Sequence, residues 1–323
     1  MDEARLMRAG LLVNPRSGKS SGKGLGLAEK LGGTPNVSVK LLERFDALPQ
    51  ILNEFAGAGV TDLFISSGDG TIQAVQTELA ERKPFAHLPR LVLLPHGTTN
   101  MTAADLGLRL RGIGAEADFI KSFQPKDLHG RPTLRAANPR DGRPRHGMFL
   151  GTGAVSEAAR FFQRALDARG GNGKLAAAAT LASALLRALF TTSDPADLSR
   201  FDRPFVISVD AGGKPIASGR HLLVLATTLE KLLFGTRPFW GGKQAAIRST
   251  IIPYPVPWTP RWLLPVLYGG ENRKGPPGSI SFSATELAIR SPVSFILDGE
   301  FFDGPEGEAL RVETGPVFTY VRG

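Results

Sequence analysis

Cysteine is absent from the 323-residue chain, and histidine is scarce. The lack of cysteine excludes a disulfide framework, a thiolate metal site and a cysteine nucleophile. It also fits a reducing compartment. No two histidines stand at the spacing of a metal-binding pair; they are His87, His96, His129, His146 and His221. We therefore do not expect a zinc site.

Long apolar runs are also missing. The N-terminal residues, MDEARLMRAGLLVNPRSGK, contain no apolar core of the length that signal peptides have. The longest run of apolar and small residues, Leu175 to Leu186, is too short to span a bilayer and includes Thr and Ser. We expect it to be a helix packed within the protein. These features predict a cytoplasmic protein, with peripheral contact to the inner face of a membrane as an option.

Negative charge is in deficit, because 39 Lys and Arg against 30 Asp and Glu give a net charge of +9. This surplus indicates an anionic partner, which could be a nucleotide, a nucleic acid or an acidic membrane surface. An Arg-rich composition without functional meaning is the alternative, since the basic residues are spread along the chain. No helix or strand concentrates them with aromatic residues, as nucleic-acid binders require, so we expect no nucleic acid.

The most informative stretch runs from Asp62 to Leu79. Leu63-Phe64-Ile65 is typical of a buried strand, and the spacing of the apolar residues after Gly70 predicts a helix. Between them lie Ser67, Gly68, Asp69, Gly70 and Thr71, where glycine allows the backbone to approach a ligand and the helix N-terminus attracts phosphate. This pattern favours a nucleotide phosphate loop with Asp69 placed to hold a metal ion or polarise a hydroxyl. A plain strand-to-helix turn is the alternative.

Two further strands of the N-terminal part end in loops of similar composition. Leu11-Leu12-Val13 is followed by Asn14, Pro15, Arg16, Ser17, Gly18 and Lys19, which resembles a P-loop but lacks its first glycine. Leu91 to Leu94 is followed by Pro95-His96-Gly97-Thr98-Thr99-Asn100, and then by a short helix from Met101 to Leu106. Strands that alternate with helices, here with a strand at Val37–Leu42 and a helix at Leu48–Gly57, predict a parallel sheet with these loops on one edge.

From about Thr133 the pattern changes to short strands separated by turn residues, which predicts an antiparallel β domain. The expected strands are Gly147–Leu150, Phe205–Val209, His221–Thr227, Ala245–Ile252, Ser279–Phe282, Leu287–Ile289 and Val293–Leu297. A helical pair at about Ser156–Ala168 and Lys174–Thr191 is inserted among them.

All three tryptophans, Trp240, Trp258 and Trp262, lie in a proline-rich stretch between Phe234 and Tyr268. Tryptophan favours the membrane interface, and 11 Lys and Arg against 5 Asp and Glu between Phe201 and Arg290 favour an anionic surface. The alternative is a proline-rich loop held to the core by its aromatic side chains.

Near the C-terminus, an apolar strand at Phe295-Ile296-Leu297 runs into Asp298-Gly299-Glu300. Asp-Gly between two strands is the commonest type I′ turn, so a simple hairpin is the interpretation that local evidence favours.

Taken together, four segments resemble the diacylglycerol kinase catalytic family, which includes sphingosine and ceramide kinases and related bacterial lipid kinases. They are NPRSG at 14–18, SGDGTIQAV at 67–75, PHGTTNMTAADLG at 95–107 and LDGE at 297–300. The resemblance implies an N-terminal α/β nucleotide domain like that of NAD kinases, at residues 1–125, and a C-terminal β-sandwich lipid-substrate domain at 126–304. It also implies that the last residues, 305–323, return to the first domain.

The resemblance further implies an activity, the transfer of the ATP γ-phosphate to a lipid hydroxyl with Mg²⁺ at a membrane surface, as part of phospholipid metabolism. By the same resemblance, Asn14 to Gly18 lie along the nucleotide, and the phosphates are held by the 67–71 loop together with Gly97, Thr98 and Asn100. Glu300 matches the catalytic carboxylate, with Asp298 next to it, and Asp69 acts on the metal or shares the role of base. A homodimer is one option that the family suggests.

The sequence departs from the family pattern in several places. Ser67 replaces a glycine, His96 takes a usually apolar position, and Met101 stands where an acidic residue is common. The family segment D-G-x-L-D, linked to a structural Mg²⁺ site, should fall near Gly241–Ile247, which here reads GGKQAAI without a carboxylate. We therefore expect no second metal site. An NAD kinase and a non-catalytic nucleotide- or lipid-binding protein are the alternative functions.

Overall fold

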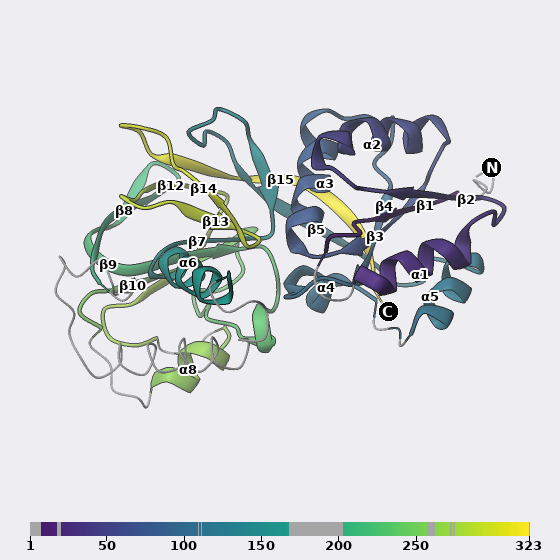
Figure 1. Ribbon diagram of the computed structural model, residues 1–323. Coiled ribbons are helices and arrows are strands. Elements are labelled where there is room, and N and C mark those ends of the chain that lie inside the picture. Colours follow the sequence, from purple (N-terminus) through teal and green to yellow (C-terminus); the bar gives the residue numbers. More distant parts are fainter. Residues whose placement is uncertain are drawn as a thin grey trace. The chain divides into compact units, whose positions relative to one another are not determined.

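The computed structural model describes residues 8–17, 21–108, 110, 112–167, 203–256, 262–271, 273 and 275–322. Gly18, the predicted helix at 174–191, the apolar run at 175–186 and Trp258 lie outside these residues. The chain divides into two compact units, the first made of Met1–Thr133 with Gly315–Gly323 and the second of Leu134–Thr314 (Figure 1).

The first unit contains a parallel sheet in the strand order β15-β4-β3-β1-β2. The strands are β1 (Ala9–Val13), β2 (Val37–Leu41), β3 (Asp62–Ser67), β4 (Arg90–Pro95) and β15 (Leu310–Val321). All residues of β1 and β3 are buried, as expected of central strands covered on both faces. The predicted parallel sheet is therefore present.

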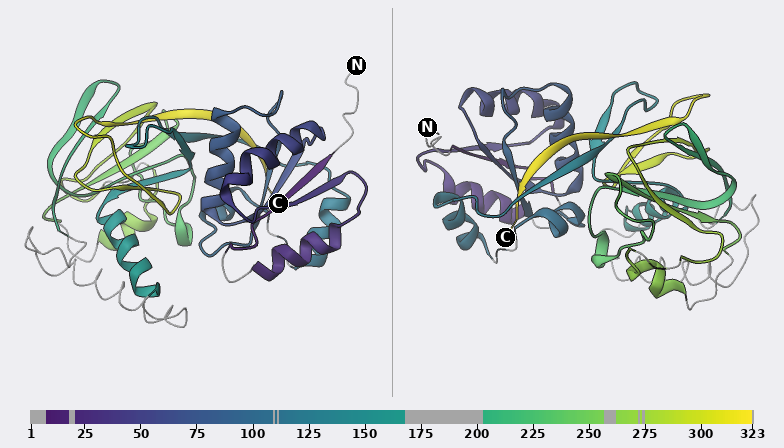
Figure 2. Two further views of the ribbon diagram at one scale, coloured as in Figure 1. Left: turned by 45° about the horizontal axis from the view of Figure 1, so that its top comes forward. Right: turned by 180° about the vertical axis from the view of Figure 1, so that it is seen from behind.

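Helices cover both faces of this sheet (Figure 1, Figure 2). They are α1 (Ser21–Leu31), η1 (Phe45–Ala47), α2 (Leu48–Gly57), α3 (Asp69–Glu81), α4 (Met101–Leu106) and α5 (Ile113–Lys121). Alternate strand residues, including Leu11, Val13 and Phe64, pack with Leu27 of α1 and Ile120 of α5 in one apolar cluster. The sequence pattern predicted α2, α3 and α4 but neither α1 nor α5.

The second unit is built from antiparallel strands around its own apolar core. The elements are β5 (Leu128–Ala136, which begins in the first unit), β6 (Arg145–Gly147), β7 (Phe149–Gly153), α6 (Ala154–Asp167), β8 (Phe205–Ala211), β9 (Lys214–Thr227), η2 (Leu233–Gly235), β10 (Ile247–Pro253), α8 (Leu263–Tyr268), β11 (Ile280–Ala284), β12 (Glu286–Arg290), β13 (Phe295–Leu297) and β14 (Glu300–Phe302). The long strand β9 pairs with β7, β8 and β10 and so organises the sheet.

Strand β15 contributes residues to both units. Its first residues, such as Val312, pair with β12, and Tyr320 pairs with Leu91 of β4. The buried Tyr320 hydroxyl also accepts a hydrogen bond of 2.7 Å from the Gln76 amide of α3. Within the described ranges, no helix combines the length and the apolar character that a membrane span needs.

Candidate active site

Three loops of the first unit leave neighbouring strands at the same edge of the sheet. They follow β1, β3 and β4, which are adjacent and parallel, so their carboxyl ends lie together. In open α/β sheets this edge is where ligands bind. The structure thus brings together the predicted residues at 14–17, 67–71 and 97–100.

The loops after β3 and β4 touch through two glycines. A Cβ atom on Gly97 would lie 2.2 Å from the Cα of Gly68 and 2.8 Å from its nitrogen. Both distances are far below van der Waals contact, so only glycine fits at position 97. Helix α3 starts directly after Gly68, and no side chain caps it. Its first amide groups are therefore available to an anion at this edge.

Asp69 joins the same two loops by hydrogen bonds. Its two carboxylate oxygens accept bonds of 2.9 Å from the backbone amides of Met101 and Thr102, at the start of α4. Burial raises the pKa of the Asp69 carboxyl above its usual value, and the two amide bonds oppose that rise. Asp69 therefore acts as an anchor that caps α4 from a distance.

A metal role for Asp69 stays a prediction. Both of its oxygens are already engaged with amides, and a bound ion would have to share or displace them. Among the residues that the structure describes, no group of three or more His, Asp or Glu side chains could hold a metal ion.

The loop after β1 is fixed to the 67–71 loop through Asn14. The buried Asn14 amide donates a hydrogen bond of 2.9 Å to the Thr71 hydroxyl, and its oxygen accepts one of 2.9 Å from the backbone amide of Arg16. The Ser17 amide closes the turn on the Asn14 carbonyl at 3.1 Å. Arg16 remains exposed, and Pro15 and Ser17 are partly so.

Asn100 shapes the third loop from within. It adopts a left-handed conformation with φ of 51°, which asparagine tolerates. Its side-chain oxygen accepts a bond of 2.7 Å from the Gly97 amide, and its amide group donates to the Gly97 carbonyl at 2.8 Å. Thr98 is exposed beside it. Ser67 differs from these loop residues, because its side chain is buried and its hydroxyl has no hydrogen-bond partner in the described part of the chain.

Sequence reasoning missed a buried polar chain beneath the glycine loops. Ser66 Oγ lies 2.8 Å from His96 Nδ1, and His96 Nε2 lies 3.1 Å from Glu116 Oε1 on α5. All three side chains are buried. A neutral imidazole that donates from Nε2 to the carboxylate and accepts at Nδ1 from the hydroxyl satisfies both contacts. The one signal in the sequence was the polar residue at position 96.

We expect His96→Leu to destabilise the protein by about 3–5 kcal/mol, because it leaves the Glu116 carboxylate buried without its partner. The double change His96→Leu with Glu116→Leu should recover most of this loss, since an apolar pair replaces the polar one. Urea unfolding of both variants measures the difference. If His96→Leu alone were as stable as the wild type, the hydrogen bonds among Ser66, His96 and Glu116 would not contribute to stability.

In the second unit, Asp298 and Gly299 form the turn between β13 and β14. Both have positive φ, 50° and 92°, and Leu297 pairs with Glu300, as a type I′ hairpin requires. The predicted hairpin is confirmed. Asp298 is buried and accepts bonds of 2.9 Å from the amides of Met148 and Phe149.

Glu300 is exposed next to this turn, and within the described residues its carboxylate forms no hydrogen bond or ion pair. Asp298 thus fixes the hairpin by hydrogen bonds, as Asp69 fixes the loops after β3 and β4. Glu300 is the carboxylate of the hairpin that remains accessible.

The segment at 241–247 carries a lysine in place of the family's carboxylates. Lys243 forms ion pairs of 2.8 Å with Glu230 and 2.6 Å with Glu271. These two hydrogen bonds raise the pKa of the lysine amino group. An ammonium group therefore ties together three separate parts of the chain.

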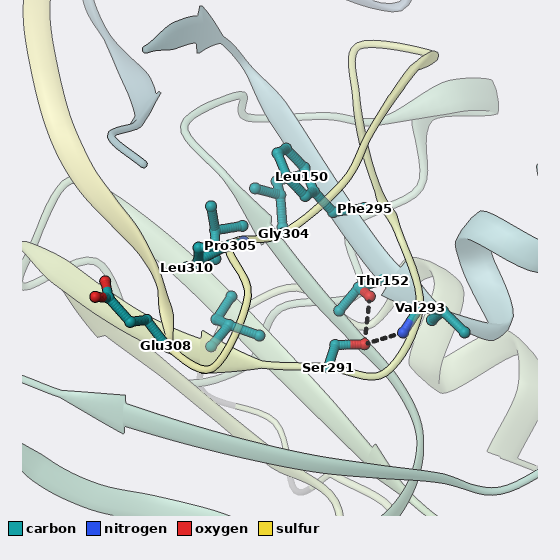
Figure 3. A pocket seen from close by; sticks show the side chains of 10 residues that line it. Leu150, Thr152, Ser291, Val293, Phe295, Gly304, Pro305, Glu308 and Leu310 are labelled. Atoms are coloured by element: carbon teal, nitrogen blue, oxygen red, sulfur yellow. Dashed lines mark hydrogen bonds between the residues drawn. The ribbon is translucent and has the colours of Figure 1, made fainter. Parts of the chain in front are cut away.

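Two cavities lie at the base of the hairpin in the second unit. One, shown in Figure 3, has a volume of about 20 Å³ and is lined mainly by apolar side chains such as Leu150, Phe295 and Leu310. It has room for about one water molecule. The other measures about 280 Å³ and is lined by Arg140, Arg160 and acidic side chains, so its charges largely cancel.

Comparisons with known proteins agree with this geometry. Residues 8–128 match the family model of the diacylglycerol kinase catalytic domain. Comparison with curated proteins finds no match. The solved structure of a candidate diacylglycerol kinase from Bacillus anthracis str. Sterne is 18% identical, covers 98% of this chain and 97% of its own, and has a TM-score of 0.66.

The solved structure of a diacylglycerol kinase from the same organism is 16% identical and has a TM-score of 0.62. The match again covers 98% of this chain and 97% of the other. At these identities the likeness shows the fold, and it confirms the predicted α/β unit followed by an antiparallel β unit.

Proposed function

We propose that the protein is an ATP-dependent lipid kinase, because residues 8–128 match the family model of the diacylglycerol kinase catalytic domain. It transfers the γ-phosphate of ATP to a hydroxyl group of diacylglycerol or a related lipid. The observation that carries the proposal is the direct contact of two glycine loops, Gly68 on Gly97, at the carboxyl edge of a parallel sheet.

The glycine loops would hold the phosphates. Phosphoryl transfer depends chiefly on positioning and on stabilising negative charge. The start of α3 has no side-chain cap, and Gly68 and Gly70 offer backbone amides without a Cβ in the way. The Thr71 amide is bonded to the Gly68 carbonyl at 3.2 Å, so Thr71 would line the loop with its side chain. Gly97, Thr98 and Asn100 lie beside them, and Asn14 to Ser17 extend the surface along the nucleotide. Asp69 would fix the loop after β3 to the loop after β4 through its bonds with the amides of Met101 and Thr102.

Glu300 would accept the proton of the attacking lipid hydroxyl. A general base must be accessible and must not already be engaged, and Glu300 meets both conditions in the described structure. Asp298 would position it, because the bonds from Met148 and Phe149 fix the turn from which Glu300 projects.

Magnesium remains the expected counter-ion of the ATP phosphates, where it would neutralise developing charge. The described residues offer no carboxylate cluster for it. We therefore assign no step of the transfer to the ion.

The first experiment is label transfer from γ-labelled ATP with Mg²⁺ into a panel of extracted lipids, with NAD as a parallel acceptor. Label in a lipid band supports the lipid kinase and names its substrate class. Label in NAD would instead assign the protein to the NAD kinases. Binding of ATP without label in either acceptor would favour a non-catalytic nucleotide-binding protein.

A further inference from the structure

The second unit exposes four large apolar side chains on two short helical segments. Phe234 and Leu233 of η2 are 84% and 39% exposed, and Leu264 and Tyr268 of α8 are 67% and 51% exposed. We call these four residues the apolar ridge. Single exposed apolar residues are common, but a group of them, aromatic ones included, marks a surface that another phase or molecule covers.

The two segments of the ridge are fixed to each other. The backbone amide of Arg237 donates a bond of 2.5 Å to the Leu267 carbonyl, and the Gly270 amide donates one of 3.3 Å to the Arg237 carbonyl. In α8, Val266 is buried while Leu264 and Tyr268 face outward. The apolar side chains are therefore held on the surface by a packed scaffold.

Phe234 is held outward at a conformational cost. Its φ of 57° lies in the left-handed region, which is unfavourable for a bulky side chain. The turn around it is closed by bonds from the Leu232 amide to the Thr236 carbonyl at 2.8 Å and from the Gly235 amide to the Leu232 carbonyl at 3.0 Å. Strain that presents an aromatic ring to solvent points to a function for that ring.

The charges around the ridge are mostly positive. From Thr228 to Lys274 the only acidic residues are Glu230 and Glu271. Both pair with Lys243, at 2.8 Å and 2.6 Å, and Glu230 also lies 3.9 Å from Arg248. The basic residues Arg237 and Arg273 are exposed, and Lys231 is partly exposed. An apolar surface with a basic rim is complementary to a bilayer that contains anionic lipids.

We propose that the apolar ridge is the membrane-docking surface of this protein, with Phe234 and Leu264 inserted among acyl chains and Arg237 and Arg273 at anionic headgroups. This proposal rests on the proposed function in one respect: membrane docking would give a lipid kinase access to its lipid acceptor. Vesicle binding needs neither ATP nor turnover, so it is tested separately from the kinase assignment.

The test is binding of the full-length protein to vesicles of phosphatidylglycerol mixed with phosphatidylcholine, with pure phosphatidylcholine for comparison. Phe234→Asn with Leu264→Gln removes the apolar anchors, and asparagine also suits the left-handed backbone at 234. We expect binding to fall about tenfold or more. Arg237→Gln should lower binding about fivefold, and only on anionic vesicles. Val206→Thr, at a site on β8 that is 71% exposed, is the matched control and should bind as the wild type does.

Tryptophan fluorescence provides a second measurement on the unmodified protein. Trp240 and Trp262 lie in the same stretch as the ridge. Brominated lipids should quench the emission in the wild type and in Val206→Thr, and much less in the double variant. Undiminished vesicle binding by the double variant would overturn the proposal. So would a change in the oligomeric state of that variant with unchanged vesicle binding, because the ridge would then be a protein interface.

Discussion

Replacing Glu300 by alanine should reduce phosphoryl transfer by about 10²–10⁴-fold, the usual contribution of a general base. Binding of ATP should stay within a few fold of the wild type, since Glu300 lies in the second unit and the glycine loops in the first. The hairpin should persist because Asp298, and not Glu300, holds the turn. Single-turnover label transfer and binding of a fluorescent ATP analogue measure the two quantities.

Two further variants make this experiment specific. Glu286→Ala removes another exposed glutamate of the same unit, at the start of β12, and should leave transfer unchanged. Asp298→Ala should lower stability by about 3 kcal/mol, because the amides of Met148 and Phe149 lose a charged acceptor. If Glu300→Ala turned over as fast as the wild type, Glu300 would not be the general base.

Much of the candidate site in the first unit could be predicted from local sequence because its determinants are local. Apolar strands that end in glycine and small polar residues at 67–71 and 95–100 have one simple arrangement, a parallel sheet with loops at its carboxyl edge. The hairpin at Asp298-Gly299 followed from the turn preference of that dipeptide.

Helix α1 could not be predicted in this way. Its sequence, SGKGLGLAEKL, contains three glycines, which are unfavourable in helices and typical of loops. The structure shows why one of them is needed, because a Cβ on Gly24 would lie 2.7 Å from Ser66 Oγ and 2.8 Å from Val13 Cγ1. Close packing of helix on sheet, a tertiary requirement, overrides the local preference.

The hydrogen-bonding role of Asp69 also could not be predicted from the sequence. A carboxylate between two glycines indicates phosphate or metal chemistry, but its hydrogen-bond partners, Met101 and Thr102, lie more than thirty residues further along the chain. The same holds for Ser66, His96 and Glu116, which meet only in the fold. Contacts of this kind depend on strand order and helix placement, which no local pattern records.

Among the described glycines of the first unit, Gly97 is the one whose replacement by alanine should do most damage. The new Cβ would lie 2.2 Å from Gly68 Cα, a backbone atom that cannot rotate away, and 2.8 Å from Asn100 Oδ1. The two loops must separate, at a cost of about 1–3 kcal/mol in stability. Because a misplacement of about 1 Å can cost about 10²-fold in rate, kcat/KM for ATP should fall by that order.

The comparison with Gly57→Ala separates loop geometry from the loss of a glycine as such. Gly57 ends α2, and no atom lies within 4 Å of a Cβ placed there. Alanine at that position should raise stability slightly, by up to about 0.5 kcal/mol, since it lowers the entropy of the unfolded chain. Its kinetics should match the wild type. If Gly97→Ala bound the ATP analogue as tightly as Gly57→Ala does, the contact of the two glycine loops would not be what holds the nucleotide. The phosphates would then have to be held by residues other than those of the 67–71 and 97–100 loops.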